Sequence, residues 1–91
     1  MRLEDLYSII SQRKKEMSEN SYVSTLIKKG DDAILQKIGE EAIEVVIAAK
    51  SQDKQRIIEE VADLYFMTLM MLVSKKIGIG SIFEELDKRK K

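Results

Sequence analysis

The amino-acid sequence predicts an all-α fold, a helical hairpin of two long helices with short helices flanking it. The 91 residues include no Pro and only four Gly, so few positions interrupt a helix. Charged residues make up 35% of the chain and share it with apolar residues at helical spacing. This length suits one domain, which we place at residues 1–91.

The first segment of the chain predicts two short helices. Apolar residues recur at the spacing of one helix face, and we expect this first helix to end near Met17. Those residues are Leu3, Leu6, Tyr7 and Ile10. Ser21 then precedes a short apolar run as a helix cap, and Gly30 follows it where a helix end favours glycine.

Two long helices come next and define the hairpin. Asp31 or Asp32 opens the first, which we expect to run to about Lys50. After a turn centred on Gln52, Asp53 is placed to cap the second.

The second long helix is expected to end near Lys76, because Gly78 and Gly80 follow it. Ser81 and Glu84 then match the capping box of a final short helix.

Composition excludes several classes of function. Without Cys or His the chain cannot build thiolate or imidazole metal sites, disulfides or Ser-His-Asp triads. Sixteen basic and sixteen acidic residues balance, which argues against a general nucleic-acid or membrane-surface binder. No N-terminal apolar segment resembles a signal peptide, so we expect a cytoplasmic location.

The segment 64–74 is the longest run without a charge, and it is too short for the roughly 20 residues that cross a bilayer. Residues 64–73 are apolar nearly all round the expected helix, which is typical of a core or an interface. One hairpin partner cannot cover such a band, so we expect a homodimer or a higher oligomer.

Carboxylates gather on one side of the first long helix. On a helical wheel Glu40, Glu41 and Glu44 share roughly a quarter of the circumference with Lys37. Acidic residues at this spacing are often only a solvated helix face.

The second long helix carries a matching pair, Glu60 and Asp63. In an antiparallel hairpin turning at residue 52, Glu41 should face Asp63, and Glu44 should face Glu60. Two carboxylates about 6 Å apart repel by roughly 3 kcal/mol at an effective dielectric near 20. A bound hard cation such as Mg²⁺ would offset this repulsion and hold phosphate groups, with an unligated Glu as the base.

A local anion-binding patch is a candidate for phosphate binding. Lys28 and Lys29 precede Gly30, and three hydroxyl groups lie upstream in the same short helix. These hydroxyls belong to Ser21, Tyr22 and Ser24. Solvated lysines that complement a helix C-terminus explain the patch equally well.

Other cations are further candidates for phosphate contact. Lys37 can either pair with Glu41 along its helix or contact a substrate phosphate. Arg13 and Arg89 are the other two cations considered for this role.

The acidic pattern carries a resemblance. Glu41-x-x-Glu44, fifteen residues and Glu60-x-x-Asp63 resemble the metal-binding pattern of the all-α nucleoside-triphosphate pyrophosphatase (MazG-like) superfamily. The string KIGEEAIEVVIAAK at 37–50, with SYVSTL at 21–26, is similar to the phosphoribosyl-ATP pyrophosphohydrolase family of histidine biosynthesis.

That resemblance implies a Mg²⁺-dependent hydrolysis of phosphoribosyl-ATP to phosphoribosyl-AMP and pyrophosphate. It also implies that the chain forms an intertwined helical-bundle dimer. It assigns metal binding to Glu41, Glu44, Glu60 and Asp63, and it places Glu40 beside them as a ligand or water-orienting base. The motif does not decide which carboxylate is the base.

Two other functions remain open. The first is a MazG-like pyrophosphatase that removes non-standard nucleotides, and the second is a non-catalytic helical assembly module. Members of the resembling family often carry His near the position of Met67, and this chain does not.

Overall fold

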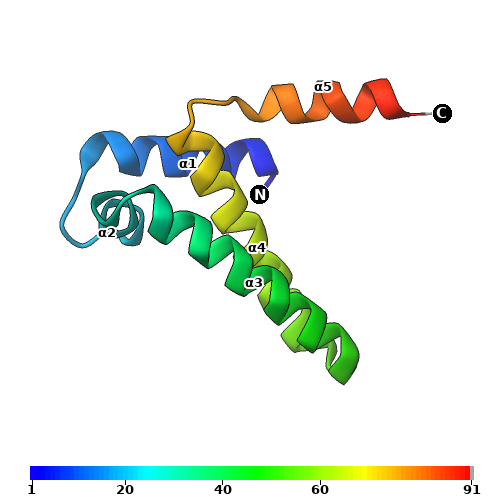
Figure 1. Ribbon diagram of the computed structural model, residues 1–91. Helices are drawn as coiled ribbons and strands as arrows, with labels where there is room; N and C mark the ends of the chain where they lie inside the picture. The colour runs from blue at the N-terminus through cyan, green and yellow to red at the C-terminus, as the bar shows by residue number, and fades with distance from the viewer. Residues whose placement is uncertain (91) are drawn as a thin grey trace.

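The computed structural model describes residues 1–90 and confirms the all-α prediction, because every regular element within them is a helix (Figure 1). Lys91, the last residue of the predicted domain, lies outside the described residues. The helices are α1 (Leu3–Glu16), α2 (Tyr22–Lys29), α3 (Asp31–Ser51), α4 (Lys54–Ser74) and α5 (Ile79–Arg89). None of them is long and apolar enough to cross a membrane.

The two long helices α3 and α4 lie antiparallel and form the predicted hairpin (Figure 1). The turn between them contains Gln52, whose φ of 62° is left-handed. Asp53 then caps α4, because its side chain accepts hydrogen bonds from the backbone N–H groups of Gln55 at 3.1 Å and Arg56 at 3.3 Å. The predicted turn and cap are both confirmed.

The short helix α2 fills the corner between α1 and α3 (Figure 1). Ser21 caps it as predicted, because its Oγ accepts a hydrogen bond from the Ser24 N–H at 3.3 Å. Gly30 ends it with φ 97° and ψ 173°, a conformation that is essentially restricted to glycine. The sharp change of direction between α2 and α3 therefore depends on a residue without Cβ.

We expect Gly30→Ala to lower the free energy of unfolding by about 1–3 kcal/mol, because alanine must adopt that strained conformation. Gly39→Ala is the matched control. Gly39 lies inside α3 with no atom within 4 Å of an added Cβ, so alanine there should stabilise by about 0.5–1 kcal/mol. Denaturant unfolding of both variants checks the opposite signs, and equal effects would contradict this account.

The ends of the last two helices differ from the prediction. The proposed cap at Ser81 is wrong, because α5 already begins at Ile79 with Gly78 as its N-cap residue. The Ser81 N–H instead donates to the Gly78 carbonyl at 3.1 Å within the first turn. The helix α4 ends at Ser74, two residues before the expected Lys76, whose φ of 61° is left-handed.

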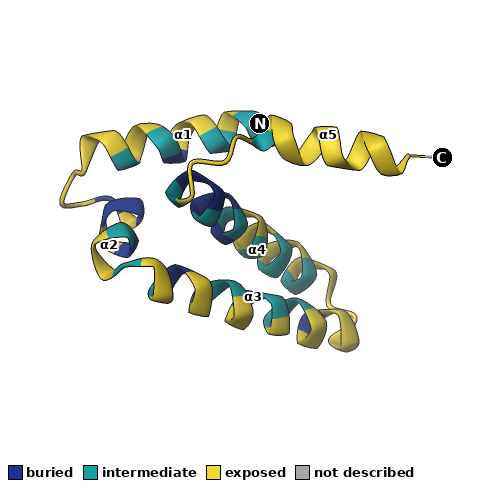
Figure 2. Ribbon diagram, turned by 45° about the horizontal axis from the view of Figure 1, so that its top comes forward, coloured by how far each residue is buried: buried dark blue, intermediate teal, exposed yellow. Residues whose placement is uncertain are grey.

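The hydrophobic core lies where α1, α2 and the start of α3 pack against the second half of α4 (Figure 2). Its buried members are Ile10, Val23, Leu26, Ile34, Met67, Leu69, Met70, Leu72 and Val73. The hairpin end at residue 52 and the whole of α5 are largely exposed (Figure 2). One chain therefore buries half of the apolar band predicted at residues 64–73, covers most of the rest in part and leaves Tyr65 exposed.

Candidate active site

Three carboxylates converge between the two long helices. Glu41 on α3 and Glu60 and Asp63 on α4 each offer an oxygen, and these oxygens lie within 4.8 Å of one another. Glu41 and Glu60 are half-buried, whereas Asp63 is exposed. The predicted approach of Glu41 to Asp63 is thus confirmed, and we call these residues the carboxylate triad.

The carboxylate triad concentrates negative charge with little compensation. Burial raises the pKa of Glu41 above its ordinary value, and the charges of Asp63 and Glu60 raise it further. A hydrogen bond with Glu60 acts in the same direction, and only the ammonium of Lys37 opposes it. A cation bound between α3 and α4 would relieve this repulsion.

We expect the carboxyl group of Glu41 to make the metal-free protein less stable as pH rises. The folded pKa of Glu41 lies above its unfolded value of 4.5, so the folded state binds more protons between these two values. Its contribution to the free energy of unfolding therefore falls as pH rises from 4.5 through the raised pKa. Glu41→Gln should remove that loss, which denaturant unfolding of wild type and variant from about pH 4 to 8 measures.

The carboxylate of Asp31 changes stability with pH in the direction opposite to that of Glu41, so its effect must be measured separately. Hydrogen bonds from Lys75 and Ser74 lower the pKa of Asp31, so its stabilisation is present above its ordinary pKa and is lost as the solution becomes more acidic. Asp31→Asn should leave the loss attributed to Glu41 in place. A pH profile that Glu41→Gln does not alter would contradict the assignment.

Glu44 lies outside the carboxylate triad. Its Oε2 is 3.7 Å from Nη2 of Arg56, and both side chains are partly exposed. Helix heights predict Glu60 opposite Glu44, and they leave out Arg56, which contacts Glu44 in the structure. The signal was present, because Arg56 lies four and seven residues before Glu60 and Asp63 and so shares their side of α4.

Two lysines and a further carboxylate meet beside the triad, in a cavity of about 190 Å³ between α2 and α3. It is lined by Leu26, Lys29, Ala33, Gln36, Lys37 and Glu40. Glu40 accepts a hydrogen bond from Gln36 at 3.2 Å. Lys37 connects the cavity with the triad, because its charge also acts on Glu41.

The remaining candidates differ in their surroundings. Ser21 is buried, and its hydroxyl oxygen caps α2. Tyr22 is half-exposed, and its ring centroid lies 6.0 Å from that of Phe66 on α4. Lys28 and Arg13 are exposed, make no ion pair among residues 1–90 and do not line the cavity between α2 and α3.

Two further residues singled out in the sequence, Arg89 and Met67, make other contacts in the structure. Arg89 pairs with Glu85 along α5 at 3.1 Å. Met67, near the position where the resembling family often has His, is 3% exposed and packs in the hydrophobic core. Its thioether is therefore a packing group here.

Comparison with known proteins identifies the family. The model of the family described as phosphoribosyl-ATP pyrophosphohydrolase matches residues 3–90. The chain is 51% identical to the phosphoribosyl-ATP pyrophosphatase of Listeria monocytogenes, over 96% of this chain and 84% of the relative. Proteins of the same name from Leptospira biflexa, 46% identical over 98% and 94%, and Metallosphaera sedula, 43% identical over 98% and 96%, are also similar. The chain belongs to the phosphoribosyl-ATP pyrophosphohydrolase family.

Proposed function

We propose that this chain hydrolyses phosphoribosyl-ATP to phosphoribosyl-AMP and pyrophosphate in histidine biosynthesis, in the cytoplasm. Water attacks the phosphoanhydride, the bond to the leaving pyrophosphate breaks, and the water proton passes to a base. The observation that supports this reaction best is the convergence of Glu41, Glu60 and Asp63 in a chain of this family. Such a group suits a phosphate-rich substrate only when a cation accompanies it.

Mg²⁺ is the proposed cofactor, and the residues fit it. All three members of the carboxylate triad are oxygen donors, which a hard cation prefers. Burial raises the pKa of Glu41, and the negative charges of Asp63 and Glu60, which a cation would offset, raise it further. When bound, Mg²⁺ would supply charge stabilisation to the phosphate oxygens. Glu44 is a proposed fourth ligand, which requires it to exchange its contact with Arg56.

The chain's other polar groups receive roles from their positions. We assign Lys29 and Lys37 to the substrate phosphates, because both line the cavity beside the triad. Glu40 lines the same cavity outside the triad, so we propose it as acceptor of the water proton. We keep Lys28, Arg13 and Ser21 as further proposed contacts to the substrate phosphates. Lys28 and Arg13 do not line that cavity, and Ser21 is buried as the cap of α2.

A pyrophosphate-release assay with Mg²⁺ tests the function, using phosphoribosyl-ATP beside a panel of ordinary and damaged nucleotides. We expect the highest kcat/KM with phosphoribosyl-ATP. A higher value with a damaged nucleotide would identify a MazG-like house-cleaning pyrophosphatase. No release from any substrate would favour a helical assembly module.

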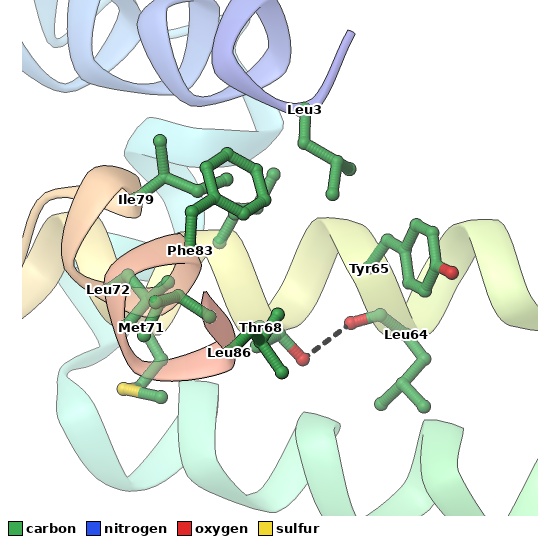
Figure 3. A pocket seen from close by; sticks show the side chains of 11 residues that line it. Leu3, Leu64, Tyr65, Thr68, Met71, Leu72, Ile79, Phe83 and Leu86 are labelled. Carbon is green, nitrogen blue, oxygen red and sulfur yellow. Dashed lines mark hydrogen bonds between the residues drawn. The ribbon is translucent and has the colours of Figure 1, made fainter. Parts of the chain in front are cut away.

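We further propose that two copies pack as a dimer through α4 and α5. A compact protein of 10.5 kDa exposes about 5400 Å²; this chain exposes 6643 Å². An apolar cavity of about 390 Å³ between these helices and the start of α1 belongs to this exposed surface (Figure 3). Phe83 and Leu86 of α5 line it and are 37% and 57% exposed.

We expect sedimentation at micromolar concentration to give a species of twice the 10.5 kDa chain mass. Leu86→Glu should shift it toward the monomer, because it places a charge in the apolar cavity. Ile9→Glu, at an exposed position of α1 outside that cavity, is the control and should leave the dimer intact. A wild-type monomer, or equal effects of the two variants, would refute this interface.

A further inference from the structure

Two aromatic side chains from different helices meet about one helical turn along α4 from Asp63 of the carboxylate triad. The chain has three Tyr, two Phe and no Trp, so aromatic residues are scarce. The rings of Tyr22 on α2 and Phe66 on α4 have centroids 6.0 Å apart and planes inclined at 34°. This tilted arrangement is a favourable aromatic contact that fixes one ring against the other.

The two rings differ in their surroundings. Phe66 is partly buried and packs against the hydrophobic core, so its position is held by α4 and its neighbours. Tyr22 is 51% exposed and directly follows the capping residue Ser21, which anchors the start of α2. The ring of Phe66 is therefore held in place, and the ring of Tyr22 that rests against it is open to a ligand.

The position of the pair relates it to the proposed phosphate site. Phe66 follows Asp63 by three residues on α4, and residues at this spacing are neighbours on a helix surface. Only a ribose separates the base of a nucleotide from its first phosphate. A nucleotide whose phosphates lie at the carboxylate triad thus brings its base within reach of Tyr22.

We infer that Tyr22, supported by Phe66, is the base-binding surface of this enzyme and stacks its ring on the adenine of the substrate. This inference rests on the proposed function and adds the residues that would recognise the purine. Stacking needs the aromatic ring of Tyr22 and does not need its hydroxyl group. That separates it from a role in which the hydroxyl donates to a phosphate.

Two variants distinguish the ring from the hydroxyl. NMR titrations of wild type, Tyr22→Phe and Tyr22→Leu with AMP, and in parallel with ribose 5-phosphate, measure binding with and without a base. We expect Tyr22→Leu to weaken AMP binding by roughly 5- to 150-fold and to leave ribose 5-phosphate binding within about twofold. Tyr22→Phe should bind AMP like wild type.

Leu35→Ala is the matched control, because Leu35 is similarly exposed at 47% but lies on the side of α3 away from the acidic residues. Circular dichroism melting of each variant shows that it folds. With phosphoribosyl-ATP, Tyr22→Leu should raise KM more than it lowers kcat, since stacking on the base acts before and during the reaction.

Three results would overturn the inference: Tyr22→Leu that binds AMP like wild type, Tyr22→Phe that loses as much affinity as Tyr22→Leu, or a wild type that binds ribose 5-phosphate as tightly as AMP. The proposed function fails separately. A wild type that binds AMP through the Tyr22 ring but releases no pyrophosphate from phosphoribosyl-ATP would refute the reaction and support the base site.

Discussion

Asp63→Asn is expected to lower kcat/KM for phosphoribosyl-ATP by about a thousandfold while the helices remain folded. The amide keeps the shape of the side chain but removes the charge that would hold a hard cation between Glu41 and Glu60. The expected loss corresponds to about 4 kcal/mol of transition-state stabilisation. A pyrophosphate-release assay at saturating Mg²⁺ measures it.

The control for this variant is Glu59→Gln. Glu59 precedes Glu60 on α4, accepts a hydrogen bond from Gln55 at 3.2 Å and lies outside the carboxylate triad. Glu59→Gln should keep near-normal activity, although it removes the same charge.

The stability of Asp63→Asn gives a second readout. Without metal it should be as stable as wild type or more so, because Asp63 contributes to the repulsion felt by Glu41. An active Asp63→Asn, or one that unfolds, would show that the acids are structural.

Removal of divalent metal is expected to reduce pyrophosphate release to the background rate, and added Mg²⁺ should restore it. The carboxylate triad cannot hold a triphosphate alone, because its charges and those of the substrate repel. Dialysis against EDTA followed by Mg²⁺ titration measures the loss and the recovery. Full activity in excess EDTA would contradict the metal site.

The same titration should change thermal stability. A cation that binds only the folded state at a hundred times its Kd stabilises by about 2.7 kcal/mol, which raises Tm by roughly 10–20 °C in a domain of this size. Asp63→Asn should show a much smaller rise. Equal rises in the variant and in wild type would place the bound cation elsewhere on the chain.

Local sequence signals account for most of the helices. The apolar spacing of Leu3 to Ile10, the caps at Ser21 and Asp53 and the glycine at position 30 each act within a few residues. Such signals operate before any tertiary contact forms, so they are readable from the sequence.

The approach of Glu41 to Asp63 was also predictable, because two helices with equal rise that turn near Gln52 place these residues at equal height. The family was predictable from the sequence at 21–26 and 37–50, and the family model that matches residues 3–90 shows it. The sequence therefore determined the hairpin, the height of its carboxylates and the family.

Tertiary structure decided which side chains share the site. The axial rotation and crossing of α3 and α4 bring Glu60 into the group with Glu41 and leave Glu44 beside Arg56. These quantities depend on packing over the whole interface and not on the height of one residue.

Packing of α2 onto the hairpin decided which lysine and which aromatic side chain lie near the site. It selects Lys29 rather than Lys28 for the cavity beside the triad, and it brings Tyr22 to Phe66. Contacts between segments so distant in sequence follow from how the core fills, which no local pattern specifies.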